Sequence, residues 1–255
     1  MTGSGCNRSW HDHRPNYRYS QGMMEIEKNR VLNVAFPALA LLLCLLVLAR
    51  YQIANGFSII SGDRYDYVIS TTILEHWFNF FTGKANWSDL LYFHPYGRTI
   101  AQTDAYFLVG VAYLPFRLLG FDPFISSEFS GMLIKAMGFV FMFLFVRNKA
   151  GLTVSWSVLA AALFTLSNGM TSNSSRLQLA TVAFAPLLAH LLWNTFETLL
   201  NADIKKFRIF GIASGILFGA WCLSCFYMAW FFVFFATVLF IILLLSCNSA
   251  ARGKL

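Results

Sequence analysis

Three acids occur in the stretch "SGDRYDYVISTTILEHW", residues 61–77. Asp63 and Asp66 are three residues apart, so on a helix or a tight turn both carboxylates could face one pocket. Such a pair could supply a general base for an acceptor hydroxyl, or hold a divalent cation such as Mg²⁺ or Mn²⁺ through its oxygens. The same spacing is typical of acids that cap the N-terminus of a solvated helix. Both interpretations remain open at this point.

Further polar candidates follow in the same region. The segment "YFHPYGRTIAQTDAYF", residues 92–107, combines a stiff turn with an acid, and that acid could join the pocket. Its histidine could equally be a loop residue that makes ordinary hydrogen bonds. The candidate catalytic residues are therefore Asp63 and Asp66, the candidate metal ligands are Asp63, Asp66 and Asp104, and the candidate substrate-binding residues here are Glu75, His94 and Asp104.

Two cations complete the set of candidate substrate-binding residues. Arg176 heads an apolar run in "NSSRLQL", and its planar guanidinium suits a phosphate. Lys135 lies inside another apolar run, downstream of Glu128. A charge at the centre of a bilayer costs about 2.5 to 3.5 kcal/mol on insertion scales, so Lys135 should face protein or a wet cavity. There it could bind a phosphate or pair with Glu128, and a lysine that snorkels is the alternative.

The composition places these residues in a membrane protein. Hydrophobic residues make up 57% of the chain and charged residues only 12%, too few to cover a soluble domain of this length. The net charge of +7 is spread over short basic segments between apolar runs, which is typical of cytoplasmic loops and not of a nucleic-acid surface. The C-x-x-C at Cys222 and Cys225 lies in an apolar stretch without a second ligand pair, which favours packing over redox or metal chemistry.

The apolar runs predict an all-α, polytopic fold. A span needs about 20 apolar residues. The run 101–120 is interrupted by Pro115 and Arg117, which favours a re-entrant or interfacial helix. We expect a basic, disordered tail at 1–30 and a membrane domain at 31–255. The predicted spans are 31–50, 124–146, 152–170, 177–197, 209–225 and 227–246.

This span count predicts which segments share a side of the membrane. With six spans, both termini and the basic clusters at 147–149, 205–208 and 251–254 are cytoplasmic, as the usual Lys/Arg bias requires. The outer side then receives the loop 51–123, the segment 167–176 and the turn 224–227. An aromatic helix within the loop, "DYVISTTILEHWFNFFTG", should lie on the membrane surface and hold Asp66 in its first turn.

The order of motifs resembles a known family. The segments "GDRYD", "ILEHW", "LLYFHPYGRTIAQTD" and "SSRLQLATVAFAPLLA" follow one another as in the N-terminal module of polytopic GT-C-fold glycosyltransferases from a bacterial branch. The resemblance implies transfer of a sugar from a polyprenyl-phosphate donor to a lipid, glycan or protein hydroxyl at the outer face of the bacterial inner (plasma) membrane. It also implies that Asp63 or Asp66 is the base or a metal ligand, and that Asp104 is a second acidic position.

Other functions stay open. Relatives in that family are longer, so the chain could be an N-terminal half or could need a second membrane subunit. A transporter or flippase-like component would use Lys135, Glu128 and His190 as polar groups along a pathway through the membrane. A non-catalytic assembly subunit is the third alternative.

Overall fold

The regular structure of the protein is entirely helical in the part that can be described. The computed structural model describes residues 33–171 and 176–252, and no strand occurs among them. The predicted all-α class is therefore confirmed for these residues, whereas the predicted tail at 1–30 lies outside them. Contacts between Cα atoms divide the chain into two units, Met1–Leu39 and Ala40–Leu255, and the predicted site residues all belong to the second.

The helices follow one another with short connections, except between α3 and α4, where residues 82–106 contain only two short 3-10 helices. An apolar helix over Asn33–Leu48 comes first. The remaining elements are α2 (Arg50–Ala54), α3 (Arg64–Phe81), η1 (Leu91–Phe93), η2 (Ile100–Gln102), α4 (Phe107–Leu118), α5 (Pro123–Lys149), α6 (Val154–Thr165), α7 (Asn168–Thr171), η3 (Leu179–Phe184), α8 (Ala185–Leu200), α9 (Ile204–Ser224) and α10 (Phe226–Arg252).

Among residues 33–171 and 176–252, three helical segments are long and apolar enough to cross a membrane: Pro123–Lys149, Leu179–Leu200 and Ile204–Ser224. Four shorter apolar helices accompany them, at Asn33–Leu48, Phe107–Leu118, Val154–Thr165 and Phe226–Ile242. The predicted span at 152–170 is thus helical over fewer residues, because α6 ends at Thr165 and the short α7 follows. These helices support a membrane protein, while the number of six spans stays a prediction.

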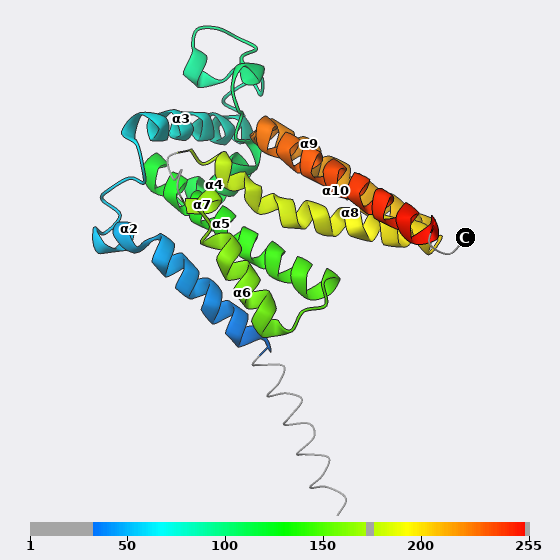
Figure 1. Ribbon diagram of the computed structural model, residues 1–255. Coiled ribbons are helices and arrows are strands. Elements are labelled where there is room, and N and C mark those ends of the chain that lie inside the picture. The colour runs from blue at the N-terminus through cyan, green and yellow to red at the C-terminus, as the bar shows by residue number, and fades with distance from the viewer. Residues whose placement is uncertain (1–32, 172–175, 253–255) are drawn as a thin grey trace, which may run out of the picture. The chain divides into compact units, whose positions relative to one another are not determined.

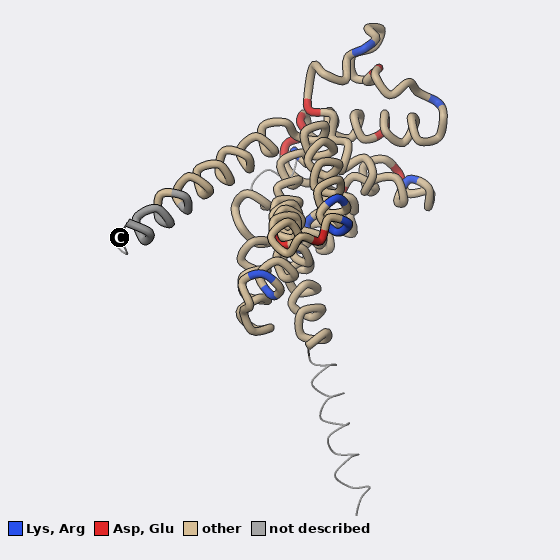
Figure 2. The backbone as a smooth tube through the Cα atoms, turned by 90° about the vertical axis from the view of Figure 1, so that its right-hand side faces the viewer, with Lys and Arg blue, Asp and Glu red and all other residues tan. Residues whose placement is uncertain are grey.

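The distribution of charged and apolar residues is compatible with a membrane protein. In Figure 2 many charged residues lie near loops and helix ends, whereas the helix that leads to the C-terminal end shows no charged residue in its described part. Large apolar side chains on α9 and α10 remain exposed, for example Ile216 and Phe235, each at 68%. An exposed apolar surface of this kind is compatible with lipid contact.

Helix α5 begins and ends with residues that stabilise helix termini. Asp122 is its N-cap and accepts hydrogen bonds from the backbone N–H groups of Phe124 (2.9 Å) and Ile125 (3.1 Å), and a proline occupies the first helical position. Arg147 and Lys149 lie in its last turn, where the helix dipole favours cations. This explains why the observed helix extends past both ends of the predicted span.

Helix α3 is held against α4 by a buried tryptophan. The indole N–H of Trp77 donates to the carbonyl of Ala105, and the ring lies directly against Gly110. A Cβ at Gly110 would come within 2.6 Å of the Trp77 ring, so only glycine fits there. The helices α8, α9 and α10 extend side by side from the same region (Figure 1). The start of α3, the start of α4 and the α9–α10 turn thereby meet.

Candidate active site

The first element of the candidate site is an ion pair between Asp66 and Arg176. The Nε of Arg176 donates to Oδ2 of Asp66 at 2.6 Å, although the residues are 110 positions apart in the chain. The hydrogen bond to Asp66 and the charge of that carboxylate raise the pKa of Arg176. Both side chains are partly exposed, so the pair is open to solutes. The structure thus brings together two residues that were predicted separately as base and phosphate ligand.

Asp63 has the capping position. Its backbone is extended, and its Oδ2 accepts a hydrogen bond from the backbone N–H of Asp66 at 3.3 Å. This is the geometry of an N-cap residue. Of the two interpretations of the Asp63 and Asp66 spacing, the structure therefore gives Asp63 a capping contact and gives Asp66 the partner across the fold.

Asp104 lies between two helix starts. Its Oδ1 accepts the backbone N–H of Phe226, the first residue of α10, at 3.3 Å. In return, the hydroxyl of Ser224 at the end of α9 accepts the backbone N–H of Leu108 in α4 at 2.7 Å. The N-terminus of α10 is therefore capped by Asp104, which lies just before α4, and the N-terminus of α4 is capped by Ser224, which lies just before α10. These contacts hold the Asp104 carboxylate against the α9–α10 turn.

The surroundings of Asp104 favour its protonated form. Burial raises the pKa of Asp104, and hydrogen bonds from the Phe226 N–H and from the side chains of Tyr227 and Gln178 only partly oppose that rise. A carboxylate with a raised pKa is a better proton acceptor once it is ionised. Perturbed carboxylates of this kind are common at functional sites, although structural groups show them too.

Tyr106 joins the two acids. Its backbone is left-handed (φ 57°), and its hydroxyl lies 3.1 Å from the hydroxyl of Ser70 on α3. Burial raises the pKa of Tyr106, the hydrogen bond with Ser70 opposes this, and the negative charges of Asp104 and Asp66 add to the rise. Ser70 lies four residues after Asp66 on α3, and Tyr106 lies two residues after Asp104, so this hydroxyl contact brings the two acids into one region of the fold. We call Asp66, Asp104, Tyr106, Arg176 and Tyr227 the polar cluster.

The tyrosines were missed by sequence reasoning. Tyr106 follows Asp104 by two residues, but nothing in that spacing distinguishes it from other aromatic residues. Tyr227 belongs to the 224–227 turn, which the predicted topology places on the same side as residues 51–123. That shared side was the signal that could have found it. The structure brings these segments together, and which face of a membrane they occupy stays a prediction.

Glu75 lies away from the polar cluster in a different ion pair. Its carboxylate accepts from the Arg117 Nε and Nη2, both at 2.9 Å, and from the Tyr113 hydroxyl at 2.7 Å. Burial opposes ionisation, but the hydrogen bonds from Arg117 and Tyr113 outweigh it, and the pKa of Glu75 falls below its ordinary value. Its oxygens are occupied by protein groups, so the structure offers no support for the predicted substrate contact.

The remaining predicted residues lie elsewhere. His94 is exposed in the loop after η1. Glu128 is buried on α5, and its carboxylate accepts from the backbone N–H and hydroxyl of Ser61 at 2.6 and 2.8 Å. Lys135 forms no ion pair with it, contrary to one alternative above. His190 lies on α8, where its buried Nδ1 has no hydrogen-bond partner within the described ranges.

The predicted metal site receives no geometric support. Across residues 33–171 and 176–252, no three side chains of His, Cys, Asp or Glu are placed to share a metal ion. Asp63 is engaged as a cap and Asp66 with Arg176. Mg²⁺ or Mn²⁺ binding by Asp63, Asp66 and Asp104 therefore stays a prediction.

Comparison with protein-family models, with curated proteins and with solved structures gives no match to this chain. The helices and the polar cluster are therefore the features of the molecule that indicate a function.

Proposed function

We propose that the chain is a membrane glycosyltransferase, or a part of one, that moves a sugar from a polyprenyl-phosphate donor to a hydroxyl of a lipid, glycan or protein. One observation carries the proposal: an accessible aspartate–arginine pair, Asp66 and Arg176, and the half-buried Asp104 lie in the region where the Tyr106 hydroxyl contacts Ser70 of α3. Transfer from a phosphate donor needs both a proton acceptor and a cation near the leaving group.

In this proposal the residues of the polar cluster have different roles in the reaction. The acceptor hydroxyl attacks the anomeric carbon, its oxygen forms the new C–O bond, and the bond between that carbon and the donor phosphate breaks. Asp104, with its raised pKa, takes the proton of the hydroxyl. Arg176 stabilises the departing phosphate, and Asp66 orients the guanidinium. Relative to the expectation from sequence, the base moves from Asp63 or Asp66 to Asp104, because Asp104 has a raised pKa, whereas Asp63 caps α3 and Asp66 is paired with Arg176.

The apolar helices support a lipid-borne donor. We place the polar cluster at the outer face of a bacterial inner membrane, with six spans and both termini in the cytoplasm. A second membrane subunit or a further part of the same polypeptide completes the donor cavity in this proposal. The exposed apolar surface of α10 is compatible with such a neighbour or with lipid.

The test is an assay of full-length protein, purified in detergent, with a panel of polyprenyl-phosphate sugars and hydroxyl acceptors. Asp104→Asn should lower the transfer rate by about 10² to 10⁴-fold, which is about 3 to 5 kcal/mol in barrier. Asp63→Asn is the matched control, since asparagine caps a helix as well as aspartate does and this variant should keep its activity. A chelator in the same assay tests the predicted divalent cation.

Two outcomes would contradict the proposal. Absence of sugar transfer from every polyprenyl-phosphate donor, with both the isolated chain and the complex purified from its native membrane, would exclude the reaction. Equal losses for Asp104→Asn and Asp63→Asn would show that the assigned roles are wrong.

A further inference from the structure

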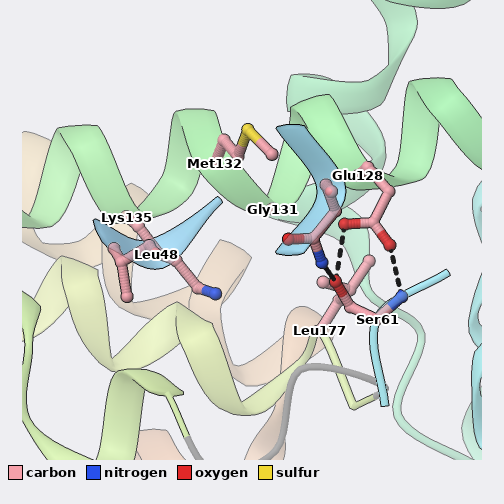
Figure 3. Close-up of a pocket in the computed structure, with 8 residues that line it drawn as sticks. Leu48, Ser61, Glu128, Gly131, Met132, Lys135 and Leu177 are labelled. Carbon is pink, nitrogen blue, oxygen red and sulfur yellow. Dashed lines mark hydrogen bonds between the residues drawn. The ribbon is translucent and has the colours of Figure 1, made fainter. Parts of the chain in front are cut away.

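A second polar site lies apart from the polar cluster, between α2, the segment 59–62 and α5. A cavity of about 380 Å³ is lined there by Arg50, Gln52, Ser61 and Lys135, with Leu48 and Ile59 among its apolar walls. Its volume is within the range of small-molecule pockets, about 300 to 1,000 Å³. A smaller pocket next to it contains Glu128 and shares Lys135 (Figure 3).

The second feature of this site is the ammonium group of Lys135. Within the part of the chain that is described, its ammonium has neither a hydrogen bond nor an ion pair. The nearby carboxylate of Glu128 turns instead to Ser61, and Figure 3 shows both of these bonds and none to Lys135. The lining of the larger cavity thus contains two cations, Arg50 and Lys135, and no acid.

This arrangement is unfavourable without a ligand. Removing a lysine charge from water is costly, and a buried charge normally obtains a partner. Helix α5 is otherwise apolar around this position and could have carried leucine or methionine there. A negatively charged ligand in the cavity would supply the missing partner for Lys135. Arg50, which is exposed and donates to the Val47 carbonyl at 2.9 Å, lines the same cavity and adds a second positive charge.

The walls of the cavity indicate where that anion comes from. Tyr51 and Ile59 line it and are 61% and 41% exposed, and the apolar helix Asn33–Leu48 ends beside it. Cationic groups next to exposed apolar side chains match a molecule that carries a phosphate on a hydrocarbon chain.

We propose that this cavity binds the phosphate group of an anionic membrane phospholipid. Lys135 and Arg50 contact the phosphate oxygens, and Leu48, Tyr51 and Ile59 contact the first carbons of the lipid. This site does not depend on the glycosyltransferase proposal, because it shares no residue with the polar cluster.

The test uses the full chain in lipid nanodiscs that contain equal amounts of phosphatidylglycerol and phosphatidylcholine. Native mass spectrometry after release from the nanodisc measures which lipid stays bound. The variants are Lys135→Met, Lys135→Arg, Arg50→Gln and the control Lys205→Met, which removes an exposed lysine from α9. A second arm measures Tm in detergent with added phosphatidylglycerol or with inorganic phosphate.

We expect the wild type to retain phosphatidylglycerol preferentially, Lys135→Met to weaken that retention about fivefold or more, and Lys135→Arg and Lys205→Met to keep it. Arg50→Gln, at an exposed position where folding is not at risk, should also weaken it. Equal retention of both lipids, or unchanged retention in Lys135→Met and Arg50→Gln, would overturn the proposal. A Lys135-dependent rise in Tm with inorganic phosphate as large as with the lipid would overturn the lipid as its source.

Discussion

Helix α3 contributes the acid of two acid–arginine ion pairs, Glu75–Arg117 and Asp66–Arg176, which differ in their hydrogen bonds and in their exposure. Glu75 accepts three hydrogen bonds from Arg117 and Tyr113, and the Arg117 guanidinium also lies 4.9 Å from the centre of the Phe78 ring. Asp66 accepts one side-chain bond, from Arg176. The side chains of Arg117 and Glu75 are 18% and 25% exposed, whereas those of Arg176 and Asp66 are 55% and 33% exposed.

This difference indicates that the Glu75–Arg117 pair is structural, whereas the Asp66–Arg176 pair is available to a ligand. Glu75 and Arg117 join α3 to α4 with every carboxylate oxygen occupied, so a ligand would have to break several bonds to use them. Arg176 can turn its guanidinium to a ligand at the cost of one exposed bond, which contributes little to stability. Residue type alone would rank the two pairs equally as sites.

The largest expected effect is a loss of activity when the Asp66–Arg176 pair is removed. Arg176→Gln should lower sugar transfer about 10² to 10³-fold, because it removes a charge that stabilises the departing phosphate. Its Tm should change little, since the pair is exposed. Arg64→Gln, at an exposed position on the same helix start as Asp66, is the control and should keep its activity. Equal activity losses in the two variants would contradict the assignment.

The converse experiment removes the less exposed pair. Arg117→Met should lower the free energy of unfolding by about 2 kcal/mol, because it takes two charge-assisted hydrogen bonds from the half-buried Glu75 carboxylate. Reversible unfolding in detergent measures the effect, and the transfer rate per folded molecule should stay near that of the wild type. A wild-type stability for Arg117→Met would show that the pair is not a structural clamp.

A smaller effect is expected where the helix starts exchange caps. Ser224→Ala removes the acceptor for the backbone N–H of Leu108 and should cost about 1 kcal/mol of stability. Ser58→Ala removes an exposed hydroxyl with a local bond only, and it should change Tm less. Equal changes in Tm for the two variants would show that the Ser224 cap does not stabilise α4.

The smallest predicted effect is a dependence of stability on pH. Because burial raises the pKa of Asp104 above that of the unfolded chain, the protonated acid favours the folded state. This contribution is complete below the ordinary aspartate pKa and is lost as the pH rises through the raised value. The Tm of the wild type relative to Asp104→Asn should therefore fall over that window. A difference independent of pH would contradict the raised pKa.

Sequence patterns predicted the helices better than their contacts. The apolar run at 124–146 predicted a membrane-length helix, and α5 occupies Pro123–Lys149. The broken run at 101–120 indicated a short helix, and α4 spans only Phe107–Leu118. Asp63, Asp66, Glu75 and Asp104 were grouped by proximity in the sequence, yet each has a different partner in the fold. Partners at separations of about 40 to 120 residues leave no periodic signal.

The sequence by itself determined an all-helical, apolar chain, because hydrophobic runs and helix caps act over a few residues. Only the tertiary structure decided that Arg176 reaches Asp66, that Asp104 contacts the α9–α10 turn and that Lys135 forms no ion pair within the described residues. Those outcomes depend on burial and on the distances between segments far apart in the chain. Both quantities arise from how the helices pack.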